Sequence, residues 1–158
     1  MTKGLVVPAD ETLPAIPRQF NNLEDYQYAV GGQIEPIEIP GLGVVMYLNE
    51  EGRPRELPFN SRVTFLHWFH VLEARNRSML VGDAVLVGPL GSDGDHVDLP
   101  DEVVYLFSSE SRFIVEARQP QGEWIRQSSA SSYFDAAVWA MLLSEKAPAL
   151  IDVKVRSV

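Results

Sequence analysis

Hydrophobic residues near the start of the chain fall into short groups that switch between extended and helical spacing. An apolar run at 3–7 predicts a strand, and the prolines at 8, 14 and 17 predict an irregular extended arm after it. The stretch 23–30 follows an asparagine, carries two acids in its first turn and precedes Gly31, which are the signals of a short helix. The N-terminal pattern therefore predicts a strand, an arm and a helix.

Three further strands are predicted between residues 34 and 87. Isoleucines alternate with glutamates at 34–39, around a proline, and the apolar run 44–48 follows. The segment Asn-Glu-Glu-Gly at 49–52 has the residues of a tight turn that closes the second of these strands. The run 81–87 predicts a third strand, which a Gly-Asp pair interrupts so that Asp83 swings outward.

Two helices are predicted in the same part of the chain. Apolar residues from Val63 to Leu72 recur at a spacing near 3.6, which predicts a broad, deeply buried helix from Asn60 or Ser61 to about Asn76. The acids that follow Pro100 are typical of a first helical turn, so 101–107 is predicted to be helical.

The pattern changes beyond residue 111. Two extended runs, 112–117 and 123–128, are joined by a Gln-Pro-Gln-Gly turn and predict a β-hairpin. A helix over 133–146, capped by a serine, and a last strand over 150–155 complete a predicted ββαβ unit.

These elements predict an α+β fold, with small mixed β-sheets packed with two main helices and a C-terminal ββαβ unit. We expect an acidic module over residues 1–110 and the ββαβ module over 111–158. The sequence leaves open whether the two modules share one core.

Four segments of the first module form a recognisable pattern: YQYAVGGQIEPIEI, YLNEEG, LPFN and LVGDAVLVG. This pattern resembles a small domain of unknown function carried by bacteriophages, bacteria and their mobile elements, over roughly residues 1 to 105. The resemblance implies an accessory protein of the phage type with no assigned reaction.

Charge is distributed unevenly. Residues 1–110 hold 17 acids against 7 bases, whereas residues 111–158 hold 5 acids against 6 bases. An acidic surface repels a phosphate backbone and attracts a basic partner, so we expect a protein partner and no direct nucleic-acid binding. No apolar run approaches the length of a membrane span, no secretory signal is visible and cysteine is absent, so a cytoplasmic protein of a bacterial host is expected.

No motif predicts a metal, a cofactor or a catalytic centre. His67 and His70 share a helix face, but H-E-x-x-H is absent, and packing explains them better. The loop with Asp93, Asp95 and Asp98 lacks the glycine and the closing glutamate of a calcium loop. The Gly31-Gly32 pair follows a helix instead of preceding one, so it does not predict a phosphate loop. We therefore expect no cofactor and no enzymatic activity.

The remaining candidates are surfaces. Charged turns and one tryptophan could contact a partner: Glu50, Glu51, Arg53, Asp93, Asp95, Asp98 and Trp124. For Trp124, packing across to the C-terminal helix is the favoured interpretation. We expect a non-enzymatic accessory protein that binds a host or viral protein through its acidic surface.

Two alternatives stay open. The acidic surface could imitate the charge of DNA and inhibit a restriction or repair enzyme. The chain could instead bind a small ligand, or act as an enzyme, at a polar pocket formed by Gly31, Gly32, Asn49, Asn60 and Asp83. The sequence does not predict an oligomeric state.

Overall fold

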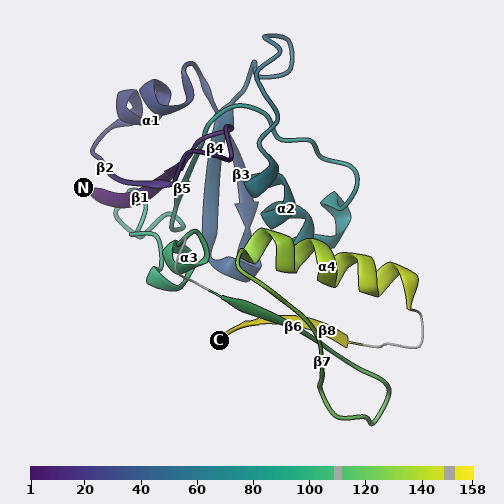
Figure 1. Ribbon diagram of the computed structural model, residues 1–158. Helices are drawn as coiled ribbons and strands as arrows, with labels where there is room; N and C mark the ends of the chain where they lie inside the picture. Colours follow the sequence, from purple (N-terminus) through teal and green to yellow (C-terminus); the bar gives the residue numbers. More distant parts are fainter. Residues whose placement is uncertain (109–111, 148–151) are drawn as a thin grey trace. The chain divides into compact units, whose positions relative to one another are not determined.

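The computed structural model describes residues 1–108, 112–147 and 152–158. These residues divide into two compact units, Met1–Val104 and Tyr105–Val158 (Figure 1). The α+β class is confirmed. All strand pairs in both sheets are antiparallel, whereas mixed sheets were expected. The reason is that several neighbouring strands are joined as hairpins, and one late strand enters the first sheet opposite in direction to both of its neighbours.

The first unit is built on a five-stranded sheet with the order β2-β1-β5-β4-β3. Its strands are β1 (Thr2–Val7), β2 (Ile16–Phe20), β3 (Ile34–Ile39), β4 (Val44–Asn49) and β5 (Ala84–Val87). The late strand β5 enters between β1 and β4, runs opposite to both and is buried along its whole length. It therefore joins the N-terminal hairpin and the β3–β4 hairpin into one sheet.

Helix α1 (Leu23–Val30) has the predicted bounds. The Asn22 side chain accepts a hydrogen bond from the backbone N–H of Asp25, and Gly31 ends the helix in the left-handed conformation with φ 78°. The helix covers one face of the sheet, where Val6, Phe20, Val45, Val85 and Val87 form a buried cluster with Val30.

Helix α2 (Ser61–His70) lies on the other side of the sheet (Figure 1). The expected end near Asn76 is wrong, because Val71 is extended with φ −126° and a short 3-10 turn, η2 (Leu72–Ala74), follows. Leu72, counted in the helical pattern, is exposed. The apolar spacing thus continues past the point where the backbone leaves the helix.

The proline-containing arm is also more regular than expected. Residues 16–20 pair with β1 as the edge strand β2, and an edge strand tolerates Pro17 because one of its two sides needs no backbone donor.

The strand predicted over residues 81–87 is shorter than expected. Val81 makes only an isolated bridge to Phe59, and the strand itself begins at Ala84.

The second unit has the predicted ββαβ order. Helix α3 (Asp101–Leu106), predicted as helical, spans the boundary between the units. The strands β6 (Phe113–Arg118), β7 (Ile125–Ala130) and β8 (Asp152–Ser157) form a sheet with the order β7-β6-β8, and helix α4 (Tyr133–Lys146) packs along one face of it (Figure 1). The second strand of the hairpin, β7, starts two residues later than expected. Residues 150 and 151 of the predicted last strand lie outside the described residues.

Candidate functional site

A hydrogen-bonded pair of side chains, Tyr47 and His96, lies on the face of the first sheet that carries α1. Tyr47 comes from the middle of β4, and His96 comes from the loop between β5 and α3. The Tyr47 hydroxyl is 2.7 Å from His96 Nε2, and His96 Nδ1 is 2.7 Å from the Gly88 carbonyl oxygen. Because a carbonyl can only accept, Nδ1 carries the hydrogen, so in the neutral ring Nε2 accepts from Tyr47.

Aromatic rings surround this pair. Tyr26 of α1 stacks on Phe20 with ring centroids 4.6 Å apart, and its ring lies 5.2 Å from Tyr47 and 6.1 Å from His96. Burial raises the pKa of Tyr47. The pKa of Tyr26 is raised too, mainly by burial and to a smaller extent by the neighbouring Tyr47. Both phenols are therefore neutral near pH 7 and can act as hydrogen-bonding groups in a wall of rings.

Two hollows flank the pair and share Tyr47, Leu90 and His96 in their linings. The larger, of about 440 Å³, has mainly apolar walls, including Pro36, Val45 and Pro89. The smaller, of about 230 Å³, extends from the pair towards Tyr26 and the start of α1.

The charged side chains of aspartate, glutamate, lysine and arginine in these hollows have one sign. Glu38 lines the larger hollow and Asp95 lines the smaller one. Among the described residues that line either hollow, none is a lysine or an arginine. The arrangement provides apolar walls, hydrogen-bonding groups and negatively charged side chains.

The structure does not bring the residues of the expected polar pocket to one site. At the end of α1, the Asn49 amide donates to the Val30 carbonyl at 3.2 Å and lies against Gly32, and Arg55 donates to the Gly31 carbonyl. Asn49 is buried and its bonds hold the turn after β4 to the helix end.

The other two members of that set act at a different place. The fully buried Asn60 donates to the carbonyls of Val7 and Gly82, at 3.0 and 2.9 Å, and Asp83 accepts from the Ala9 backbone N–H at 2.9 Å. These polar groups hold β1, the approach to β5 and the start of α2 together. The partners of these hydrogen bonds are backbone groups of the same unit, so the bonds serve the fold.

The charged turn at residues 50–53 and the acidic loop are at the surface. Asn49, Glu50 and Arg53 line a third hollow, of about 320 Å³, but the Arg53 guanidinium is bound to the Met79 carbonyl at 3.2 Å. Glu51 is exposed in the same turn.

Two of the loop acids have structural roles. Asp98 accepts from the Lys3 backbone N–H at 2.8 Å, and Asp93 accepts from the Asp95 N–H at 3.1 Å. Of the three, Asp95 is the one that lines a hollow of the candidate site.

Trp124 does not pack on the C-terminal helix. Its ring lies under Lys154 Nζ at 4.0 Å from the centroid and near the Arg118 guanidinium carbon at 4.7 Å. Both cations belong to the sheet face that α4 leaves open, so cation–π contacts hold the ring there.

The histidines of α2 serve packing. His67 Nδ1 lies 3.0 Å from the Ser78 hydroxyl, and Trp68 of the same helix donates to the Ser78 carbonyl at 2.7 Å. Within residues 1–108, 112–147 and 152–158, no group of three or more His, Asp or Glu side chains could hold a metal ion. None of the helices described is long and apolar enough to cross a membrane.

Burial gives His70 a measurable effect on stability. It lowers the pKa of His70 from the ordinary 6.5 to about 4. The neutral side chain therefore stabilises the fold fully above pH 6.5, and this contribution is lost as the pH falls from 6.5 towards 4. We expect His70→Gln to flatten the fall in the free energy of unfolding between about pH 7 and about pH 4.5, measured by urea titration. Parallel curves for the two proteins would contradict this.

Sequence reasoning missed the Tyr47–His96 pair. The two residues are 49 positions apart, and although Tyr47 begins the YLNEEG segment, neither lies in a catalytic or metal-binding motif. One signal was present: Tyr47 is the polar-tipped aromatic residue of an otherwise apolar run, and a buried tyrosine hydroxyl needs a partner.

Comparison with known proteins agrees with the resemblance noted in the sequence. The family model described as a domain of unknown function, DUF3846, matches residues 1–111. Neither the curated proteins nor the solved structures contained a match to the chain. The matched residues cover the whole first unit, including Tyr47 and His96, and the chain belongs to the DUF3846 family.

Proposed function

We propose that the first unit binds a basic segment of another protein across the two hollows beside Tyr47 and His96. The observation that carries this proposal is the composition of the hollows: apolar walls with Glu38 and Asp95, and no lysine or arginine among their described linings. Such a surface matches a segment in which an apolar residue is flanked by lysine or arginine.

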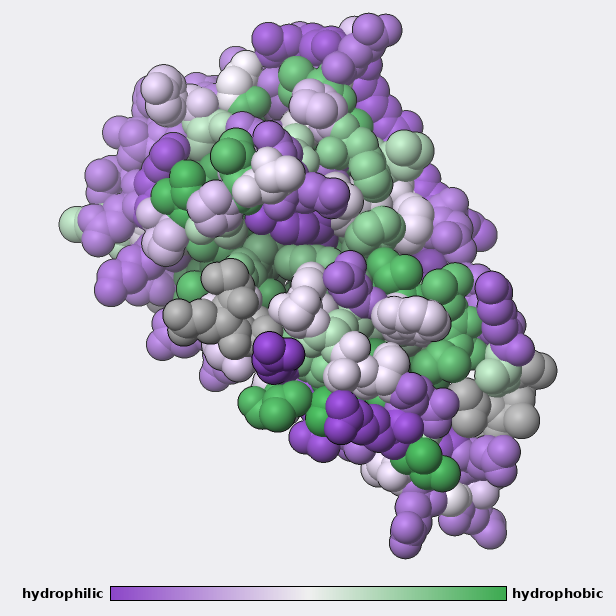
Figure 2. Space-filling model, viewed as in Figure 1, coloured by the Kyte–Doolittle hydropathy of each residue, from purple (hydrophilic) through white to green (hydrophobic). Residues whose placement is uncertain are grey.

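The charge of the whole unit supports the same partner. Residues Met1–Val104 contain 16 acids and 7 bases. In the described part of this unit, no carboxylate forms an ion pair with a lysine or arginine side chain. Figure 2 shows hydrophilic residues over much of the unit's margin in this view, with hydrophobic residues gathered between them. Uncompensated charge of one sign attracts an oppositely charged partner over several ångströms and speeds encounter.

On this proposal the protein is a non-enzymatic accessory protein of the phage type, and its partner is a host or viral protein. The neutral phenols of Tyr26 and Tyr47 agree with a binding role. A small apolar ligand is the second candidate, because the larger hollow, at about 440 Å³, has the size of a ligand pocket.

The proposal is tested with peptides of about a dozen residues in which a central leucine or valine is flanked by lysines, and with matched peptides flanked by glutamates. We expect the full chain to bind the lysine series, and the association rate to fall as salt rises. Glu38→Gln combined with Asp95→Asn should weaken this binding about tenfold, since each removed charge is worth about 0.7 kcal/mol at an exposed rim.

Glu73→Gln combined with Glu102→Gln is the matched control, because both residues are exposed and neither lines the hollows. It removes the same net charge and should have little effect. Equal losses in the two double variants would overturn the proposal, because only net charge would then matter. Binding of the glutamate series that slows amide exchange in β4, beside the hollows, would overturn it as well.

A further inference from the structure

The edges of the two sheets differ in how they are protected. Among the strands that the structure describes, β2, β3, β7 and β8 lie at sheet edges. The edges β2 and β3 contain Pro17 and Pro36, and β8 carries Lys154 and Arg156. Proline and lysine are the usual means by which proteins prevent another strand from adding to an edge.

Strand β7 carries one charged residue, Arg126, and otherwise lacks this protection. Its residues from Gln127 to Ala130 are uncharged, contain no proline and lie in a strand of six residues. One side of β7 pairs with β6, and the sheet order places no strand on its other side. The Ile125 carbonyl accepts from the side-chain amide of Gln127 at 3.3 Å, and the other backbone N–H and C=O groups on that side are available to an added strand.

The sheet face beside this edge is basic. Residues that pair across antiparallel strands share a face, so Glu116, Arg126 and Lys154 lie together opposite α4. Arg118, Asp152, Arg156 and Trp124 belong to the same face through their contacts. The face thus holds four cations and two carboxylates.

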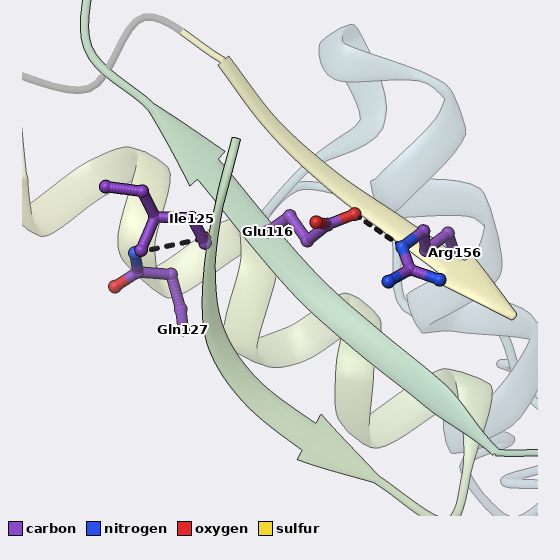
Figure 3. A network of polar contacts seen from close by, with 4 residues as sticks. All are labelled: Glu116, Ile125, Gln127 and Arg156. Carbon is purple, nitrogen blue, oxygen red and sulfur yellow. Dashed lines mark hydrogen bonds and ion pairs between the residues drawn. The ribbon is translucent and has the colours of Figure 1, made fainter. Parts of the chain in front are cut away.

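Both carboxylates are already paired. Arg156 Nε lies 2.6 Å from Glu116 Oε1, across β6 and β8 as Figure 3 shows, and Arg118 lies 2.6 Å from Asp152. In the part of the chain that the structure describes, Arg126 and Lys154 have no carboxylate within ion-pair distance. Arg126 is on β7 itself, next to the open edge.

We propose that the β7 edge accepts an extended acidic peptide as a fourth strand. In such a peptide every second side chain points to the face that α4 leaves open, where a carboxylate would meet Arg126. The apolar side chains between the carboxylates point to the other face. The open edge favours a peptide over a nucleic acid, because a phosphate backbone cannot continue the N–H···O=C ladder. This site lies in the second unit and takes an acidic ligand, whereas the proposed function places a basic ligand on the first unit.

The test uses the full chain and an acetylated, amidated peptide of about seven residues that alternates valine and glutamate. We expect saturable binding by calorimetry, with amide exchange slowed in β7. A peptide of the same sequence, N-methylated at alternate residues so that one edge cannot donate, should bind at least about tenfold more weakly. A valine–lysine peptide, which the hollows of the first unit are expected to bind, should leave amide exchange in β7 unchanged.

Arg126→Glu should lower the affinity for the acidic peptide about tenfold or more. Arg77→Glu, at an exposed position of the first unit, should leave this affinity unchanged. Equal affinity of the N-methylated peptide would overturn strand addition. Tighter binding of oligothymidylate than of the acidic peptide would make the face a nucleic-acid surface and overturn the proposal, and so would an absence of binding. Because Arg126 lies outside the hollows of the first unit, each of these results is independent of the proposed function.

Discussion

Replacing Asn60 with alanine is expected to destabilise the first unit more than any other single polar substitution considered. The side chain is fully buried and makes three hydrogen bonds: it donates to the carbonyls of Val7 and Gly82 and accepts from the Val63 backbone N–H at the start of α2. Alanine removes the helix cap, which costs about 1 kcal/mol, and takes the amide donor away from two buried carbonyls, at about 1 to 2 kcal/mol each. The expected loss is about 3 to 5 kcal/mol in the free energy of unfolding, measured in urea.

Two further variants separate these contributions. Asn60→Asp keeps an acceptor for the Val63 N–H but removes both amide donors, so a large part of the loss should remain. Ser61→Ala is the matched control, because Ser61 donates at the surface to the exposed Glu11 and should cost about 0.5 kcal/mol or less. If Asn60→Ala proved as mild as Ser61→Ala, the buried network would not hold the unit together.

Phe113→Ala is expected to unfold the second unit selectively. Phe113 is 1% exposed and its ring contacts those of Tyr105 and Tyr133, with centroids 6.2 and 5.3 Å away. Removing a buried phenylalanine costs about 3 to 5 kcal/mol, which approaches the whole stability of a unit as small as Tyr105–Val158. Hydrogen exchange should show lost protection in β6, β7 and α4, with protection in the first sheet retained.

The reciprocal variant is Leu66→Ala, which opens a cavity beneath α2 in the first unit. It should lower protection in the first sheet and leave the second unit protected. If either variant exposes both units together, residues 1–110 and 111–158 do not form separate modules, and they unfold as one cooperative core.

Local signals along the chain determined several elements. The bounds of α1 follow from groups adjacent in sequence, because its cap at Asn22 and its stop at Gly31 act within one helical turn. The ββαβ order of the second unit follows from alternation, one turn and one capped apolar helix. The family pattern likewise consists of contiguous segments, and it identified the first unit.

Other features depended on neighbours that are distant in sequence. The arm at 16–20 is a strand because β1 offers it an edge, and α2 stops at His70 although apolar spacing continues. Local propensity predicts neither feature, because strand pairing and burial depend on the rest of the fold. Strand propensity is therefore a weak guide at a sheet edge.

The candidate site was also decided by the tertiary structure. Asn49 and Asn60 were expected to share a pocket, but the fold uses them at separate places to satisfy buried carbonyls. Tyr47 and His96 meet only because β5 enters beside β4 and its following loop returns across the sheet. The sequence by itself determined the short-range elements, the acidic charge and the family, whereas contacts between distant residues created the site, because a hydrogen bond between remote groups leaves no periodic trace in a chain.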